Sequence, residues 1–158
     1  MSTREELRRK GDEVAERIQH GQNRRDGTRR AITHVPGLAH YTRESIFGAV
    51  WARPGLDLRY RMRAPLSVLS TLQRLPQLRT YVNSALNMGL EPLEIQEALI
   101  QCSIYAGFPT TVNALDVAHE EFEARGMEPP KTEVPEVSLD EMEARGRTRR
   151  SELMGDED

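Results

Sequence analysis

The hydrophobic pattern of the chain is helical over most of its middle part. Apolar side chains recur there at steps of three and four residues, and no useful length of sequence alternates apolar and polar positions as a strand does. Proline and glycine residues interrupt the pattern and separate five predicted helices. We expect these helices over Ala39–Val50, Asp57–Leu75, Leu78–Met88, Pro92–Ala106 and Thr110–Phe122. The sequence therefore predicts an all-α fold, a compact helical bundle.

Each predicted helix carries a stripe of apolar residues that is expected to face the core. The fourth helix has the clearest stripe, made by Ile95, Leu99, Cys102 and Tyr105. Asp57 is expected to cap the second helix, and Pro65 either kinks that helix or marks its true start. Further core positions are expected at Leu66, Leu69, Leu72, Val112, Leu115, Ala118 and Phe122.

The aromatic residues mark the extent of the core. All eight of them (four Tyr, three Phe and one Trp) lie between Tyr41 and Phe122. We therefore expect three regions: an N-terminal arm at residues 1–35, a helical domain at 36–126 and a C-terminal tail at 127–158.

The two arms are expected to differ. In the N-terminal arm the spacing predicts an amphipathic helix that ends near His20, with the apolar stripe Leu7, Gly11, Val14 and Ile18. A basic loop follows, and we interpret it as solvated rather than as a binding site for an anionic partner; its arginines are Arg24, Arg25, Arg29 and Arg30. The acidic tail is predicted to be largely disordered, with a short helix around Leu139–Arg145.

Composition and charge exclude several classes of protein. Of 158 residues, 37% are hydrophobic and 30% are charged, and 22 basic against 25 acidic residues give a net charge of -3, so no overall field favours nucleic acid. No run of about 18 apolar residues predicts a membrane helix, and Met1–Lys10 is too polar for a signal peptide. The single cysteine, Cys102, excludes a disulfide framework within the chain, and no His–carboxylate spacing predicts a metal site. We expect a soluble, cytoplasmic protein with no nucleic-acid or membrane partner.

Two blocks of sequence occur in a distinctive order. The first is Phe47-Gly48-Ala49-Val50-Trp51-Ala52-Arg53-Pro54-Gly55-Leu56-Asp57. The second begins with Ala85-Leu86-Asn87-Met88-Gly89 and continues through Glu94-Ile95-Gln96-Glu97, Gln101, Tyr105, Gly107 and Pro109. Over roughly residues 40–122 the combination resembles the carboxymuconolactone decarboxylase family, part of the alkylhydroperoxidase-like superfamily.

This resemblance implies an all-helical fold that assembles as trimers or hexamers, with pockets near the subunit interfaces. The decarboxylases of the family act on a lactone acid without a metal or organic cofactor. We therefore expect a small-molecule substrate, no cofactor, and a role in the catabolism of aromatic compounds. The peroxidase relatives use a CxxC pair, which this chain lacks, so their disulfide chemistry is not expected. Tyr81 departs from the decarboxylase branch, which usually has a histidine at this position, a candidate acid/base.

Glu44 and His40 are the candidate groups for proton transfer. Glu44 precedes Phe47 and Trp51 on the same predicted helix, and a carboxylate among aromatic rings is suited to act as a general acid or base. The alternative is a surface glutamate paired with Arg43 or Arg79. His40 lies four residues before Glu44, so a continuous helix presents both side chains on one face. His40 is then expected to replace the missing imidazole in function, or else to be a capping or surface residue at the start of the helix.

The remaining candidates concern substrate binding. Tyr81 is expected to donate a hydrogen bond to a developing enolate, or else to be a half-buried core residue. Arg61 is the best match for holding a substrate carboxylate. The alternative is that the arginines near it form ion pairs with Asp57, with Glu97 or with a neighbouring subunit. The side chains expected to line the pocket are Phe47, Trp51 and Tyr105.

The leading hypothesis is a cofactor-independent enzyme that acts on a small carboxylic acid or lactone. The reaction is expected to be a decarboxylation through an enolate, or an isomerisation or hydrolysis of a related lactone. The competing hypothesis is a non-catalytic family member that binds a ligand or serves a structural role.

Overall fold

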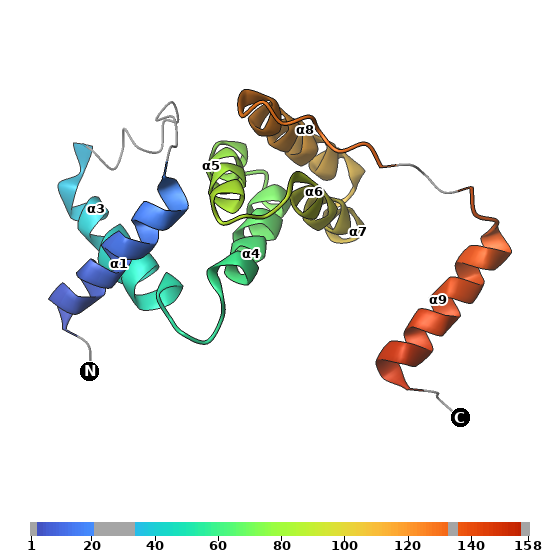
Figure 1. The fold of residues 1–158 in the computed structure, drawn as a ribbon, viewed down its shortest axis with the longest axis horizontal. Coiled ribbons are helices and arrows are strands. Elements are labelled where there is room, and N and C mark those ends of the chain that lie inside the picture. The colour runs from blue at the N-terminus through green and yellow to red at the C-terminus, as the bar shows by residue number, and fades with distance from the viewer. Residues whose placement is uncertain (1–2, 21–33, 133–135, 156–158) are drawn as a thin grey trace.

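The computed structural model describes residues 3–20, 34–132 and 136–155, and most of these residues lie in helices (Figure 1). The all-α fold predicted from the sequence is confirmed. No helix in the described residues is both long enough and apolar enough to cross a membrane. The helices are α1 (Arg4–Gln19), α3 (Pro36–Tyr41), the π-helix η1 (Thr42–Trp51), α4 (Leu58–Thr71), α5 (Leu75–Asn87), α6 (Pro92–Gln101), α7 (Ser103–Ala106), α8 (Phe108–Ala124) and α9 (Leu139–Met154).

The core lies among α4, α5, α6 and α8, which pack against one another in the middle of the molecule (Figure 1). α1 adds a further layer, because it packs on both α5 and η1. The largest side chains with less than 2% exposure come from all of these helices except η1: Ile18, Met62, Leu66, Leu78, Val82, Ile95, Leu99 and Phe122.

The second predicted helix ends earlier than expected. Asp57 caps α4 as predicted, its Oδ1 accepting a hydrogen bond from the Arg59 backbone N–H at 2.8 Å. The helix ends at Thr71, because Gln73 adopts a left-handed φ of 52° that no α-helix can contain. Leu72, predicted to face the core, is consequently 59% exposed.

The fourth predicted helix is divided into two. α6 ends at Gln101, and Ser103–Ala106 forms the separate single turn α7. The prediction that Tyr105 is buried is wrong, since its exposed fraction is 80%. Gly107, with a φ of 85°, redirects the chain into α8, which begins two residues before the predicted start, and Val112 near that start is 50% exposed rather than buried.

The helix predicted over Ala39–Val50 begins at Pro36 and changes its winding at Thr42. From there it is a π-helix, and the hydrogen bond from the Ala52 N–H to the Phe47 carbonyl oxygen, 2.9 Å long, spans five residues. Such wide turns are rare and occur often at functional sites.

The arms contain one helix each in the described residues. α1 ends at Gln19, as predicted. The helix expected around Leu139–Arg145 is longer, running on to Met154, and α9 lies apart from the other helices (Figure 1). The basic cluster from Arg24 to Arg30 lies outside the described residues, and the division of the chain into three regions stays a prediction.

Candidate functional site

Two glycines bring α1 and η1 into direct backbone contact. A Cβ atom on Gly11 would lie 2.1 Å from the Arg43 carbonyl oxygen, and one on Gly48 would lie 2.1 Å from the Leu7 carbonyl oxygen. Neither position has room for a side chain. The pairing of Gly11 with Arg43 and of Leu7 with Gly48 also shows that the two helices run antiparallel. α1 is therefore held in one register along the helix that carries Glu44.

His40 and Glu44 both face α1. The Arg4 Nε lies 3.1 Å from Glu44 Oε2, and the Arg8 Nη2 contacts both ring nitrogens of His40. The Glu44 side chain is only 14% exposed, whereas that of Arg4 is 81% exposed. The ion pair of Glu44 is thus with Arg4, and the nearby arginines considered from the sequence have other partners: Asp12 for Arg43, and Glu120 and Glu121 for Arg79.

Three aromatic rings lie in a row beside the contact between α1 and η1, which we call the α1–η1 seam. The ring centroids of Phe47 and Trp51 are 6.4 Å apart, and those of Trp51 and Tyr81 are 6.0 Å apart. Phe47 and Trp51 are buried, at 5% and 7% exposure, and Tyr81 packs against the core from α5. Burial raises the pKa of the Tyr81 hydroxyl above its ordinary value, which keeps it protonated and able to donate a hydrogen bond. The structure thus brings Tyr81 to the two aromatic residues that the sequence proposed for the pocket.

Arg61 holds the turn that follows Trp51. Its Nη2 donates to the carbonyl oxygens of Arg53 at 3.0 Å and Leu56 at 3.2 Å. Its Nε is buried without a hydrogen-bond partner in the described part of the chain. By donating to both carbonyl groups, Arg61 stabilises the turn at the end of η1.

The other arginines of α4 are engaged by α6. Arg59 and Arg63 contact the two carboxylate oxygens of Glu94 at 2.5 Å and 2.7 Å. The sequence interpretation named Glu97 or Asp57 for such pairs, and this is corrected: Glu97 is exposed, and Glu94 is the partner. Hydrogen bonds from the Glu91 backbone N–H and from Arg59 hold the pKa of Glu94 below its usual range. Glu94 thus links α4 to α6 as a structural residue.

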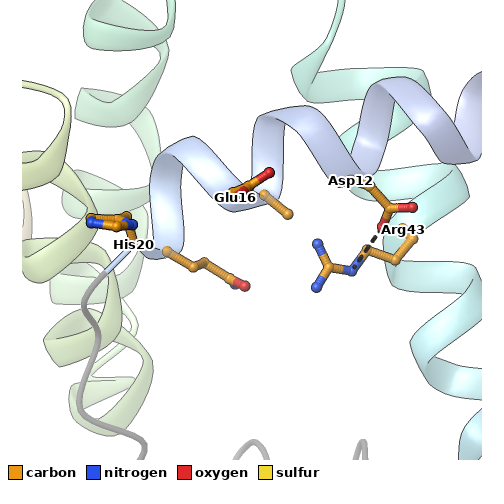
Figure 2. Close-up of a pocket in the computed structure, with 6 residues that line it drawn as sticks. Asp12, Glu16, His20 and Arg43 are labelled. Atoms are coloured by element: carbon orange, nitrogen blue, oxygen red, sulfur yellow. Dashed lines mark ion pairs between the residues drawn. The ribbon is translucent and has the colours of Figure 1, made fainter.

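A polar hollow lies along the same α1–η1 seam (Figure 2). Its volume is about 320 Å³, and its lining includes Asp12, Glu16, His20 and Arg43. Asp12 and Arg43 form an ion pair across it at 3.6 Å, and Glu16 and His20 continue along the face of α1 (Figure 2). Its lining does not include Glu44, Tyr81 or Arg61.

Two other sequence candidates lie away from the seam. Tyr105 projects from α7, which packs on α6 and α8, and it makes no ring contact with the aromatic row in the described residues. Cys102 is buried, with its Sγ 3.2 Å from the Ala98 carbonyl oxygen. Within the described residues, no group of three or more His, Cys, Asp or Glu side chains is arranged to hold a metal ion.

Sequence reasoning missed the residues that α1 brings to the site. Arg4 and Arg8 are spaced by four residues, as are His40 and Glu44, so the two pairs match when the helices pack antiparallel. That matching spacing was the available signal. In a strongly charged arm it is indistinguishable from a solvated face until the packing partner is known.

The fold and the seam define an all-α protein in which the π-helix η1 carries Glu44, Phe47 and Trp51, and α3 carries His40 one turn earlier. The model of the carboxymuconolactone decarboxylase family matches residues 36–120, more than half of the chain, and the chain belongs to this family. α1 lies outside the matched residues.

Three curated relatives support this membership. The 4-carboxymuconolactone decarboxylase of Acinetobacter baylyi is 36% identical over 85 residues, which are 54% of this chain and 63% of that protein. The nitrosuccinic acid decarboxylase of Metarhizium robertsii is 32% identical over 77 residues, 49% of this chain and 54% of that protein. An uncharacterised 15.0 kDa protein of Paracoccus denitrificans is 34% identical over 86 residues, 53% of this chain and 64% of that protein. The chain thus matches less than two thirds of the length of each relative.

Proposed function

We propose that this protein is a decarboxylase-like enzyme that acts on a small carboxylic acid or lactone without a metal or organic cofactor. The observation that carries the proposal is the nearly buried Glu44, which lies in a π-helix beside the Phe47–Trp51–Tyr81 row. Two relatives whose names state decarboxylation of organic acids support the reaction type. Composition, with 30% charged residues and a single cysteine, supports a cytoplasmic location.

The proposed roles follow from chemistry. Glu44 carries the proton, with His40 one helical turn away as a second proton-transfer group. Tyr81, kept protonated by burial, donates a hydrogen bond to the developing enolate oxygen. Phe47 and Trp51 supply the apolar wall against which an organic acid packs.

Arg61 is proposed to assist at the end of the aromatic row. It holds the turn directly after Trp51, and its buried Nε is the donor that the turn leaves unused among the described residues. A substrate carboxylate is the group that such a donor binds best.

In the proposed reaction the bond between the substrate carbon and its carboxylate breaks and carbon dioxide leaves. The electron pair of that bond passes into an enolate, whose oxygen accepts the hydrogen bond from Tyr81. Glu44 leaves its ion pair with Arg4 on taking a proton from the solvent, gives this proton to the carbanionic carbon, and returns to the ion pair as a carboxylate. The same enolate supports isomerisation of a related lactone, so the product distinguishes the two reactions.

The test is release of carbon dioxide from 4-carboxymuconolactone by the purified protein. We expect Glu44→Gln to lower kcat by about 100-fold or more, the usual size of general acid–base catalysis. Glu123→Gln, at an exposed glutamate of α8, is the matched control and is expected to retain activity. Equal activity of the wild type and Glu44→Gln would refute the role of Glu44, and ligand binding without turnover would favour the non-catalytic alternative.

We also propose that the protein assembles as a homo-oligomer, a trimer or a hexamer. The support is an exposed apolar face at α7 and the start of α8, where Ile104, Tyr105 and Phe108 are 76%, 80% and 76% exposed. Isolated apolar side chains on a surface are ordinary, but neighbouring large ones indicate an interface. In such an assembly Tyr105 would lie at the interface and would contact only a substrate bound to a neighbouring copy.

Sedimentation measurements test this assembly. Phe108→Ser is expected to lower the molar mass of the assembly measured by sedimentation, whereas Leu153→Ser on α9 is expected to leave that molar mass unchanged. A wild-type protein that sediments as a monomer at high concentration would rule the assembly out.

A further inference from the structure

The C-terminal end of α1 is attached to α5 by an asparagine side chain. The Asn87 Nδ2 donates to the carbonyl oxygen of Ile18 at 2.9 Å and to that of His20 at 2.7 Å. The last carbonyl groups of an α-helix have no partner within the helix, so a side chain from another element can satisfy them. Asn87 therefore caps the end of α1 from a neighbouring helix, at the point where α1 approaches α5 (Figure 1).

Arg125, at the end of α8, orients this asparagine. Its Nη2 donates to Asn87 Oδ1 at 2.9 Å and to the Asn83 carbonyl oxygen at 3.1 Å, and its Nε donates to Asn83 Oδ1 at 2.8 Å. Because a guanidinium can only donate, it draws the amide oxygen of Asn87 toward itself. The amide nitrogen of Asn87 then points to the carbonyl groups of α1, and the side chain is half-buried in this position.

α1 is in turn the helix on which η1 packs. The main neighbours of η1 are α1 and α3, and the contacts at Gly11 and Gly48 leave no space between the backbones of α1 and η1. η1 reaches the core of the bundle through the side chains of Phe47 and Trp51. The position of η1 relative to the bundle therefore depends on where α1 is held.

The two parts of the proposed site lie on the two helices that α1 joins. η1 carries Glu44, the proposed proton carrier, and α5 carries both Tyr81 and Asn87. A shift of α1 along α5 changes the distance between Glu44 and Tyr81, because η1 moves together with α1. A misplacement of about 1 Å in an active site can lower the rate by on the order of 100-fold.

We propose that Asn87 is a positioning residue: together with Arg125 it fixes α1 on α5 and thereby holds Glu44 at its working distance from Tyr81. This inference rests on the proposed function and adds two residues that act without touching the substrate. Arg125 and α1 both lie outside the family match at residues 36–120. The contact thus joins the two segments that flank the family domain.

Hydrogen exchange tests the contact without any substrate. In Asn87→Asp the carboxylate still accepts from Arg125 but can no longer donate to the carbonyl groups of α1. We expect the amides in the last turn of α1 to exchange about tenfold faster relative to those of α8, the factor that corresponds to the loss of a hydrogen bond. Arg125→Lys keeps the charge but loses the planar fork, so it should give a smaller increase in the same direction.

Asn113→Asp is the matched control. The Asn113 Nδ2 donates to Gln73 Oε1 at 2.7 Å, so the same substitution removes an amide donor between two elements without touching α1. Exchange in α1 should not change in this variant. Trp51 is the single tryptophan of the chain, and its fluorescence reports on η1. Acrylamide should quench this fluorescence more strongly in Asn87→Asp than in the wild type, and equally in Asn113→Asp and the wild type.

Turnover distinguishes positioning from simple stabilisation. With 4-carboxymuconolactone, at a temperature at which circular dichroism shows every variant folded, Asn87→Asp should lower kcat about tenfold and change KM less than about twofold. The double variant Glu44→Gln/Asn87→Asp should be no slower than Glu44→Gln, because Asn87 acts only through the placement of Glu44. A merely structural role would instead give two independent losses that multiply.

Three results would overturn the proposal: unchanged exchange of α1 in Asn87→Asp, an equal increase in Asn113→Asp, or a full additional loss of kcat in the double variant. If Asn87→Asp does not fold, Arg125→Lys takes its place in the exchange measurement and in the double variant. If the wild type releases no carbon dioxide, the proposed decarboxylation fails, while exchange and fluorescence still decide whether Asn87 holds α1 and η1 in place.

Discussion

α1 and α9 are helices of the same length and similar character, yet one is part of the folded body and the other is not. Both have 16 residues, both begin with a side-chain cap, at Thr3 and Ser138, and both contain ion pairs between neighbouring turns. α1 buries Gly11, Val14, Ala15 and Ile18, whereas α9 buries none of its residues. α9 accordingly lies away from the other helices (Figure 1).

This difference shows that caps and ion pairs stabilise a helix but do not make it pack against the rest of the protein. Attachment needs an apolar stripe and, in α1, a glycine at the crossing point. Gly146 of α9 has open space where a Cβ would be, while the same atom on Gly11 would meet the backbone of η1. Four predictions test this comparison.

The largest effect is expected from removing the buried anchor of α1. Ile18 is 1% exposed, so Ile18→Ala should lower the free energy of unfolding by about 3 kcal/mol, within the usual range for truncating a buried aliphatic residue. Leu153→Ala on α9, where the leucine is 84% exposed, should change it by less than about 0.5 kcal/mol. Urea denaturation followed by circular dichroism measures both, and equal losses would contradict the comparison.

A glycine pair gives the next effect, with opposite signs in the two helices. Gly11→Ala should destabilise the protein by about 2 kcal/mol, because the added methyl group has no room against the Arg43 carbonyl. Gly146→Ala should instead increase the helix content of α9, since alanine is favoured over glycine by about 1 kcal/mol in a helix interior. Thermal melting and Cα chemical shifts report the two outcomes. A stabilising Gly11→Ala would mean that α1 and η1 are not in contact in solution.

The N-caps should have similar local effects but different global ones. Thr3 accepts from the Glu6 N–H at 3.2 Å, and Ser138 accepts from the Glu141 N–H at 3.3 Å. Replacing either by Ala should cost its own helix about 1 kcal/mol. Only Thr3→Ala is expected to lower the unfolding midpoint of the whole protein, because α1 unfolds together with the core. A shift of the global midpoint by Ser138→Ala would show that α9 is packed.

The smallest effect concerns the exposed ion pairs, for which the two helices should agree. Arg9–Glu13 and Glu143–Arg147 both join residues four apart, and all four side chains are more than half exposed. Glu13→Gln and Glu143→Gln should each change helix stability by about 0.3 kcal/mol at low salt and by nothing measurable at high salt. A larger loss for Glu13→Gln would assign that pair a role in tertiary packing, which its exposure argues against.

Much of the candidate site could be predicted from the sequence. Glu44, Phe47 and Trp51 recur at helical spacing around a family motif, and the structure does place them on one helix. Tyr81 was predicted as a hydrogen-bond donor or a half-buried core residue, and it packs against the core with its ring 6.0 Å from that of Trp51. By contrast, the prediction that Tyr105 is buried was wrong. The apolar spacing of the sequence continues through Cys102, but the backbone begins the separate helix α7 there.

The sequence by itself determined the helical class, the ends marked by Asp57, Gly89 and Gly107, and the family, because capping, left-handed glycines and apolar spacing are local properties of a chain. Only the tertiary structure decided that Arg4 and Arg8 meet Glu44 and His40, that η1 is widened to a π-helix, and that Glu94 rather than Glu97 binds the arginines of α4. These depend on which helix faces which and in what register. The facing and the register of the helices follow from the packing of the whole core. They include the contact at Gly11 and Gly48, whose lack of a side chain matters only because α1 and η1 touch there.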